Sequence, residues 1–429
     1  MKMRLLIVAF AYISKCSLAQ LYYPPITGAT WETINPTSLG WCDDRIDSLY
    51  NFLEEKNSKA FIILKDGKIV LEKYYGSFNQ DSAWYWASAG KSLTSFLVGI
   101  AQKENLLNIN DTVSKFLGNN WTSLSAEKER KIKIVHQLSM NSGLKDNVTD
   151  PDCTLPSCLI YEADAGDRWA YHNAPYHLIH DVIDSASGLN INQFTNQKLA
   201  IQTGIFGLWN DHVFYSKPRV MVRFGLLMLG KGNWNNNLII TDTNYFHSMI
   251  HSSQTINNAY GYLWWLNGQQ SYMLPSVQFQ FQGSLCPNAP DDMYAALGKN
   301  DQKIYVVPSQ NMVVIRMGNK AAEIAPALSE FDNVLWEKIN KLDCTTSIKT
   351  ENINQNDVKI YPNPSSNYFN IESKEKINWI KIYDLNGKIV HQTSNTNNIS
   401  VENLSQGLYV VELISDASKS IKRLKLIID

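Results

Sequence analysis

The order of strand-like and helix-like segments limits the folds open to this chain more than any other feature of its sequence. Two β-rich runs flank Asp66 and Gly67, a favoured tight-turn pair, and predict a hairpin over residues 60–75. Helical spacing of apolar residues starts at Ser88, and further helical patterns follow from about 110 to 250. Strands return only afterwards. We therefore expect an antiparallel sheet built from both ends of this region, with a helical region inserted between them.

The returning strands are predicted at 260–265, 303–307 and 312–317, and a terminal helix is predicted over 323–341. Together with the early hairpin, they predict a mixed α/β protein of the α+β type, in which helices flank the antiparallel sheet.

Composition agrees with an ordinary globular protein. The 429 residues suffice for two or three domains, 44% of them are hydrophobic and 18% are charged. The net charge is −1, so the chain lacks the basic footprint of a nucleic-acid-binding protein, and no nucleic-acid partner is expected.

Residues 1–19 are predicted to form an export signal. A basic start precedes an apolar run at 5–13, and small residues lead up to Ala19. This run is too short to cross a bilayer and no later segment is apolar enough, so no stable membrane span is expected. Cys16 leaves a lipoprotein open, although the lysine before it does not suit a lipid-attachment site. We expect a secreted or cell-surface protein.

Export allows the cysteines to pair. Five remain after the predicted signal, so at least one must be free: Cys42, Cys153, Cys158, Cys286 and Cys344. Cys153 and Cys158 lie in a turn-rich stretch where a small loop could close.

The composition changes after Cys344. Residues 345–358 are polar and predict a linker, which ends a first unit over 20–344. Residues 359–429 contain short β-like runs, with Asn386 and Gly387 as a hairpin turn, and predict a small β-sandwich.

Ser88 and Lys91 are the candidate nucleophile and base. Their spacing places both side chains on one helical face. A serine hydroxyl needs a base to take its proton, and burial can lower the pKa of a lysine far enough for that role. The same spacing starts at Ser125 and Ser373, but in highly charged surroundings that indicate a solvated surface. From the local pattern alone, Ser88 could equally be an ordinary helix N-cap.

Tyr171 and Asn173 form the second candidate element. A tyrosine near the lysine could relay the serine proton, and an asparagine could orient a substrate. The same pattern recurs at Tyr361 and Tyr368 in the tail, so context must decide.

Five motifs in order resemble class C β-lactamases and related esterases. Besides the two pairs above, residues 136–144 resemble the family segment H-L-L-x-x-T-S-G-L. Residues 215–225 resemble the S-x-x-D-M-A-R-F-G helix, and residues 260–265 resemble the Y-G-Y-x-W-W strand. The resemblance covers roughly residues 40–343. It implies that Ser88 is acylated, that Lys91 and Tyr171 activate it, and that Asn173 positions the substrate.

The sequence departs from β-lactamases at their third motif, where Lys or His precedes Ser or Thr and Gly. No such triplet occurs, and the best alignment puts Ala296, Leu297 and Gly298 at its position. They lie within residues 296–308, which resemble the G-x-x-x-Q-x-I-x-V-x-P segment of the family's esterases and 6-aminohexanoate-dimer hydrolases. The resemblance implies an oxyanion hole made by the backbone N–H groups of Ser88 and Lys299. Without the cation a substrate carboxylate loses a partner, which argues against β-lactam recognition but not against acyl transfer.

The last 70 or so residues resemble a type IX secretion sorting domain in four segments, which begin at Tyr361, Tyr383, Leu404 and Leu424. The resemblance implies that the secretion machinery is a partner and that the tail is commonly removed. A carbohydrate-binding or adhesive β-domain is the alternative. The hydrolase resemblance also implies a second disulfide, Cys42–Cys344, because the first and last helices of that fold pack together. With Cys153–Cys158 closed, Cys286 would be free.

Other chemistries find less support. His172, His177 and His180 are close in sequence, but no acidic residue stands at a metalloprotease spacing, so we expect structural histidines and no metal. No G-x-S-x-G elbow occurs, which argues against an α/β-hydrolase.

We expect an extracellular esterase or amidase that acts on a small molecule through an acyl-enzyme and needs no cofactor. A D-amino-acid peptidase and a catalytically silent binding protein are the alternatives.

Overall fold

The computed structural model describes residues 21–321, 330–344, 358–373, 376–384, 388–414 and 420–429. The chain divides into two compact units, residues 1–344 and 345–429, and each has its own apolar core. The predicted export signal and all but the last residue of the predicted linker lie outside the described residues. Each unit is described by itself below.

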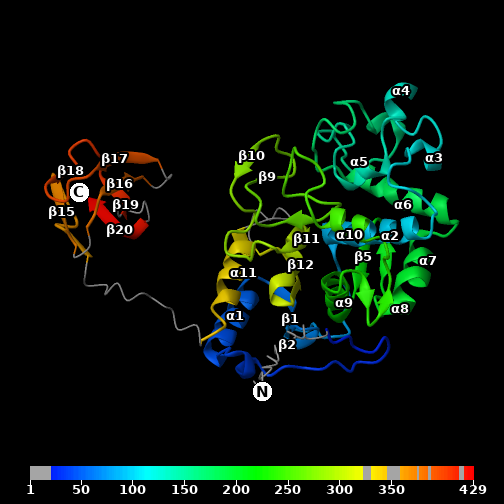
Figure 1. The fold of residues 1–429 in the computed structure, drawn as a ribbon, viewed down its shortest axis with the longest axis horizontal. Helices are drawn as coiled ribbons and strands as arrows, with labels where there is room; N and C mark the ends of the chain where they lie inside the picture. The colour runs from blue at the N-terminus through cyan, green and yellow to red at the C-terminus, as the bar shows by residue number, and fades with distance from the viewer. Residues whose placement is uncertain (1–20, 322–329, 345–357, 374–375, 385–387, 415–419) are drawn as a thin grey trace, which may run out of the picture. The chain divides into compact units, whose positions relative to one another are not determined.

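A six-stranded antiparallel sheet forms the centre of the first unit (Figure 1). Strands from the start of the unit lie beside strands from its end, as the order of segments predicted. In spatial order they are β2 (Lys68–Tyr74), β1 (Ser58–Lys65), β13 (Met312–Gly318), β12 (Gln302–Val307), β11 (Tyr294–Gly298) and β8 (Trp265–Leu266).

The predicted hairpin is confirmed as β1 and β2, which pair in antiparallel register. Gly67 in its turn has a φ of +82°, and a Cβ there would lie 2.0 Å from the carbonyl oxygen of Tyr22. Glycine therefore allows both the turn and the close approach of the N-terminal segment.

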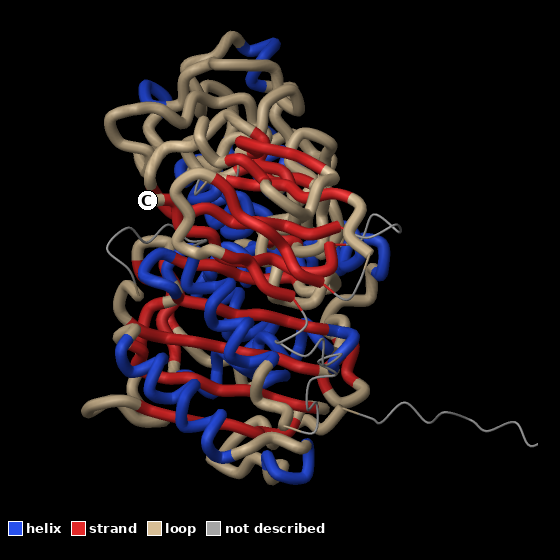
Figure 2. Tube along the Cα trace, turned by 90° about the vertical axis from the view of Figure 1, so that its left-hand side faces the viewer, coloured by secondary structure: helices blue, strands red, loops and turns tan. Residues whose placement is uncertain are grey.

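Helices cover both faces of this sheet. Figure 1 shows α1 (Asp43–Glu55) and α11 (Glu330–Asn340) on one side and α9 (Pro218–Leu229) on the other. In Figure 2 the strands run side by side with helices lying across them. Phe52 of α1 stacks on Phe331 of α11, with ring centroids 5.6 Å apart. The predicted terminal helix is found from Glu330 onward, and its predicted first part falls partly on residues 322–329, outside the described residues.

The inserted region is mainly helical, as predicted, and lies between β2 and β8 in sequence. Its central helix, α2 (Gly90–Lys103), is buried along nearly its whole length and packs against α6 and β11. The other helices are α3 (Ser114–Leu117), α4 (Ala126–Glu129), α5 (Ile134–Leu138), α6 (Asn173–Ser187), α7 (Ile191–Thr195), α8 (Ile201–Thr203) and α10 (Thr243–Met249).

Three small antiparallel sheets accompany these helices. They are β3 (Trp84–Tyr85) with β5 (Val213–Ser216) and β4 (Leu208–Asn210), then β6 (Asn233–Trp234) with β7 (Asn237–Leu238), and β9 (Ser271–Met273) with β10 (Gln280–Gln282).

The prediction of a strand over 260–265 is wrong for most of its length. Only Trp265 of this run belongs to β8, while Leu263 has a φ of +60° and the Gly261 N–H donates to the Trp264 carbonyl. The run folds back on itself, because its aromatic side chains are buried on several sides rather than on one face.

The second unit is a two-sheet β structure, as predicted. One sheet contains β14 (Val358–Tyr361), β15 (Tyr368–Ser373) and β18 (Ile399–Ser400); the other contains β17 (Ile389–Thr393), β16 (Trp379–Tyr383), β19 (Gly407–Ile414) and β20 (Ser420–Ile428). Both sheets contribute to one apolar core, which includes Phe369 and Val411. The predicted turn at Asn386 and Gly387 lies outside the described residues.

The cysteine predictions are confirmed. Cys42–Cys344 joins the two ends of the first unit with Cα atoms 5.9 Å apart, and Cys153–Cys158 closes a short loop with Cα atoms 6.0 Å apart. Cys286 is free and buried. In the described part of the chain, no helix is both long enough and apolar enough to span a membrane.

Candidate active site

Ser88 lies in a 3-10 turn, Ala87–Ala89, immediately before α2. The prediction that the α-helix starts at Ser88 is wrong by two residues, since α2 begins at Gly90. Ala87 has a φ of +48°, an unusual value for a residue with a side chain. The neighbouring Trp86 fixes this backbone, because its N–H donates to the Phe214 carbonyl at 2.8 Å. A strained turn before the helix thus presents the Ser88 hydroxyl.

Lys91 points at this hydroxyl. Its Nζ donates to Ser88 Oγ at 3.3 Å, and the whole residue is 4% exposed. Burial lowers the pKa of Lys91 to about 7, and the charge of Asp152 opposes part of this shift. Nζ also lies 4.2 Å from the ring centroid of Tyr176 and 5.3 Å from that of Tyr171. A neutral amine is therefore available near neutral pH to take a proton from Ser88.

Tyr171 reaches the same hydroxyl from the segment before α6. Burial raises its pKa to about 12, and a hydrogen bond with Ser88 opposes this rise. Its ring stacks on Trp265, with centroids 5.9 Å apart and planes 18° apart. The phenol is thus protonated at neutral pH. The phenol therefore suits the role of a proton relay better than the role of a base that is already deprotonated before the reaction.

Asn173 is the first residue of α6, and its amide is fixed by Asp152. Nδ2 donates to Asp152 Oδ1 at 2.8 Å, while Asn173 Oδ1 is buried and has no partner among the described residues. His177 Nε2 lies 3.8 Å from the same Asp152 carboxylate oxygen. The sequence analysis missed Asp152, whose only local signal is its position beside Cys153.

Gly298 brings the end of β11 against the 3-10 turn that contains Ser88. A Cβ at this position would lie 2.4 Å from the Trp86 carbonyl oxygen and 3.0 Å from the Ala89 nitrogen. Only glycine permits this approach without a shift. Lys299 follows directly, with an exposed side chain.

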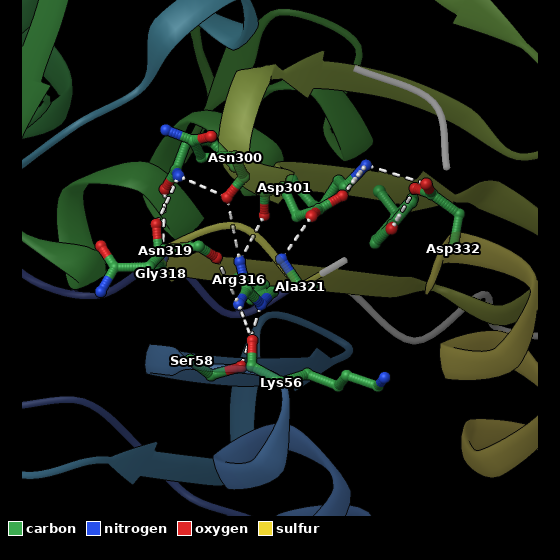
Figure 3. A network of polar contacts seen from close by, with 12 residues as sticks. Lys56, Ser58, Asn300, Asp301, Arg316, Gly318, Asn319, Ala321 and Asp332 are labelled. Atoms are coloured by element: carbon green, nitrogen blue, oxygen red, sulfur yellow. Dashed lines mark hydrogen bonds and ion pairs between the residues drawn. The ribbon is translucent and has the colours of Figure 1, made fainter. Parts of the chain in front are cut away.

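A buried arginine holds the turn that follows Lys299 (Figure 3). Arg316 donates to the carbonyl oxygens of Asn300 at 3.2 Å and Asp301 at 2.9 Å, and to Ser58 Oγ of β1 at 2.9 Å. Asn300 Nδ2 in turn donates to the Tyr85 hydroxyl at 2.8 Å, three residues before Ser88.

Ion pairs extend this network into the sheet and to α11. Lys303 Nζ lies 3.2 Å from an Asp301 carboxylate oxygen and 2.8 Å from Asp332, all in the buried interior, and the Tyr305 hydroxyl donates to Asp332 at 2.6 Å. The sequence analysis did not identify these charges, because charged residues in a strand usually face solvent.

A cavity of about 780 Å³ opens at Ser88. Tyr171 and Asn173 line it, but Lys299 does not. Its remaining wall is largely polar and includes Lys145, Asp146, Asn147, Glu162, Arg168, Ser276 and Gln278. Arg168 pairs with Asp146 at 2.7 Å. The cavity thus brings together Ser88, Tyr171 and Asn173, while Lys91 lies outside its wall and contacts it through Ser88.

The histidine cluster differs from the one considered in the sequence. His177 and His180 lie with His212, whose ring stacks on His177 at 4.1 Å between centroids. Burial lowers the pKa of all three, so they are neutral. Among the described residues, the group with metal-ligand spacing contains Cys42 and Cys344, which form a disulfide.

The two other serine motifs lie elsewhere. Ser125 is the N-cap of α4 and accepts from the Lys128 N–H at 3.4 Å, while Ser373 ends β15 in the second unit. Neither lines the cavity at Ser88.

Two protein-family models match parts of the chain. Residues 53–213 match the beta-lactamase family, and residues 359–429 match the secretion system C-terminal sorting domain. An uncharacterized protein of Alkalihalophilus pseudofirmus is 22% identical over 308 residues, which cover 62% of this chain and 85% of that protein.

Solved structures share the fold. A candidate 6-aminohexanoate-dimer hydrolase from Bacillus anthracis superposes with a TM-score of 0.54 at 16% identity, over 73% of this chain and 86% of that one. A candidate beta-lactamase from Bacteroides dorei superposes with a TM-score of 0.55 at 16% identity, over 71% of this chain and 99% of that one. A penicillin-binding protein homologue from Caulobacter crescentus superposes with a TM-score of 0.54 at 12% identity, over 70% of this chain and 98% of that one. At these identities the likeness concerns the fold alone.

Proposed function

We propose that this chain, which carries a beta-lactamase family domain and a secretion system C-terminal sorting domain, is a secreted serine hydrolase that cleaves an ester or amide bond. The observation that carries the proposal is the contact between Lys91 and Ser88. A buried amine whose pKa is lowered to about 7 lies 3.3 Å from a serine hydroxyl that opens into a cavity.

The first step is acylation of Ser88. Neutral Lys91 takes the hydroxyl proton as Oγ attacks the substrate carbonyl, which forms a tetrahedral intermediate. The backbone N–H groups of Ser88 and Lys299 stabilise its oxyanion. The approach of β11 to the nucleophile turn at Gly298 supports this pairing of donors.

Tyr171 completes the proton path. Its protonated hydroxyl bonds to Ser88 and passes a proton to the leaving group as the acyl-enzyme forms. The resulting phenolate takes a proton from the water that attacks the acyl-enzyme, and the Lys91 ammonium returns its proton to Ser88 Oγ as the bond between Oγ and the acyl group breaks. Lys91 and Tyr171 act on the same oxygen atom, so their effects are not expected to add. Asn173 borders the cavity and positions the substrate.

The substrate is an ester or amide rather than a β-lactam. No lysine or histidine stands before a Ser-Gly or Thr-Gly pair, and the exposed Lys299 side chain does not line the cavity. A substrate carboxylate therefore lacks its usual cationic partner at that position. A panel of p-nitrophenyl esters and amide dimers should reveal the preferred bond. Nitrocefin turnover within tenfold of the best ester rate would contradict this part of the proposal.

Labelling with a fluorophosphonate, read by mass spectrometry, tests the mechanism. The adduct is expected on Ser88, and Ser88→Ala should abolish both labelling and turnover. Lys91→Ala should cost nearly as much, and Tyr171→Phe roughly 10²- to 10⁴-fold. Ser125→Ala and Ser373→Ala are the matched controls and should leave activity unchanged. An adduct elsewhere, or full activity in Ser88→Ala, overturns the proposal, and the absence of any labelling or turnover favours a silent binding protein.

The route of export follows from the tail. The sorting domain indicates export by type IX secretion to the cell surface or the medium, with the secretion machinery as a partner. We assign residues 1–19 to the export signal, 20–344 to the hydrolase unit, 345–358 to a linker and 359–429 to the sorting domain. N-terminal sequencing of the exported protein tests the first boundary.

A further inference from the structure

A second cavity, of about 890 Å³, lies apart from the one at Ser88 and shares no lining residue with it. Its wall comes from three segments, within residues 26–31, 80–83 and 204–223, the last of which includes β4, β5 and the start of α9. Four of its lining residues have large apolar side chains that are exposed to solvent: Ile26, Phe206, Leu208 and Tyr215. The volume falls within the range of small-molecule sites, about 300–1,000 Å³.

One buried cation in the wall has no counter-ion. Arg223 of α9 lines this cavity and is only 6% exposed. Its Nη1 donates to the Thr203 carbonyl at 3.2 Å and its Nη2 to the Pro25 carbonyl at 2.7 Å. No carboxylate of the described chain lies within ion-pairing distance of Arg223. Burial accordingly lowers its pKa to about 10.

The neighbouring cations differ from Arg223 in this respect. Arg219 pairs with Glu72 through two bonds of 2.7 Å, and Lys217 pairs with Asp81 at 2.8 Å. A guanidinium has five N–H donors, and the structure gives acceptors to two groups of the Arg223 fork. The rings of Trp31 and Trp234 lie 5.1 and 5.6 Å from Arg223 Cζ and stabilise its charge in part, but neither ring is an anion. A carboxylate beside the guanidinium would add charge-assisted hydrogen bonds.

We propose that this cavity binds an amphipathic anion, a carboxylate that carries an alkyl chain, with its head group at Arg223 and its chain along Phe206, Leu208 and Tyr215. Charge complementarity selects the head group, because Asp81 in the wall pairs with Lys217 and no carboxylate of the described chain pairs with Arg223. The exposed apolar side chains of the wall favour the alkyl chain of the ligand, because they lose contact with water when the ligand binds. This site is separate from the proposed hydrolytic site and does not depend on its chemistry.

Calorimetry on the full chain with sodium decanoate, below its micellar concentration, tests the proposal. Decan-1-ol has the same chain without the charge and should bind at least about tenfold more weakly, the minimum expected for loss of a charged hydrogen bond. Equal affinity for decanoate and decan-1-ol, or no binding of decanoate, would overturn the proposal.

Two matched leucines locate the site. Leu208 in the cavity wall and Leu238 in β7, outside it, are 57% and 52% exposed. Leu208→Asp should weaken decanoate binding at least about tenfold, because a second anion then faces the alkyl chain, and Leu238→Asp should leave binding unchanged. Equal binding by the two variants contradicts the site.

Arg223→Met tests whether the carboxylate head group binds at Arg223, and circular dichroism checks that the variant folds. If this variant does not fold, the comparison of decanoate with decan-1-ol still decides the role of charge. Prior labelling of the protein with fluorophosphonate should leave decanoate binding intact. Loss of binding after labelling would place the anion at Ser88 and overturn the inference without touching the proposed hydrolase activity.

Discussion

Lys91 loses nearly all contact with water in the first turn of α2, where aromatic rings surround its amine. Burial is the main cause of its lowered pKa, and Asp152 is the charge that acts against it. Asp152 also holds the Asn173 amide at 2.8 Å. One exposed carboxylate thus influences both the proposed base and the amide that we propose positions the substrate.

The pH dependence of the reaction follows from these charges. Lys91 accepts a proton only as the neutral amine, so kcat/KM should rise with pH through an apparent pKa of about 7. Asp152 favours the ammonium form, so Asp152→Asn should move this rise to lower pH. The rate of fluorophosphonate inactivation between pH 5 and pH 9 measures the shift without knowledge of the substrate. Asp167→Asn, an exposed carboxylate outside the cavity, is the control, and an unshifted Asp152→Asn profile contradicts the assignment.

The candidate site could be predicted where its chemistry is local in sequence. Ser88 and Lys91 are three residues apart, and Tyr171 and Asn173 form another short motif. Asp152 has no such motif, because its role comes from its contact with Asn173 across a loop. The position of the second cavity could not be predicted from the sequence either, because three separate segments form its wall.

At the scale of elements, β12 and β13 carry charges into the core behind the 3-10 turn that contains Ser88. Arg316 on β13 joins β1 to the Asn300–Asp301 turn, and Lys303 on β12 joins that turn to Asp332 on α11 (Figure 3). Such a network stabilises the fold only while every charge has its partners.

Removal of Arg316 should therefore be costly. Arg316→Met leaves several buried carbonyl oxygens without their donor and should lower the free energy of unfolding by about 3–5 kcal/mol. Denaturation by guanidinium chloride, followed by tryptophan fluorescence, measures the change. Arg45→Met is the control, because Arg45 and Asp44 are both exposed and their pair should contribute little. Equal stability of the two variants would contradict a structural role for the network.

Element prediction worked where local composition and turn residues agree. The β1–β2 hairpin has β-rich apolar runs on both sides of Asp66 and Gly67, and the structure contains it as expected. The aromatic run at 260–265 has the composition of a strand, but it is buried and folds back on itself. The strand prediction from composition was therefore wrong for most of this run. The start of α2 was missed by two residues, because the 3-10 turn at Ser88 depends on tertiary contacts of Trp86.

At the scale of the whole molecule, the two disulfides constrain the chain very differently. Cys42–Cys344 closes a sequence separation of 302 residues and Cys153–Cys158 one of 5. Chain entropy then predicts a loss of about 6 kcal/mol when both cysteines of the long bridge become serine, and about 2 kcal/mol for the short one. Thermal unfolding of the two double variants tests this order, and a larger loss from the short bridge would contradict it.

The two units have separate cores, so loss of the tail should not expose the core of the hydrolase unit. A sorting domain has served its purpose once the protein has crossed the outer membrane, and the polar segment 345–358 offers a place for cleavage. We therefore expect protein from the culture medium to lack residues 359–429, while the cell-associated precursor still carries them. Intact-mass spectrometry of both fractions provides the measurement. The exported form should also keep its full fluorophosphonate labelling, because Ser88, Lys91 and Tyr171 all lie in the first unit. A mass in the medium that still includes residues 359–429 would show that the tail remains as a surface anchor or binding domain.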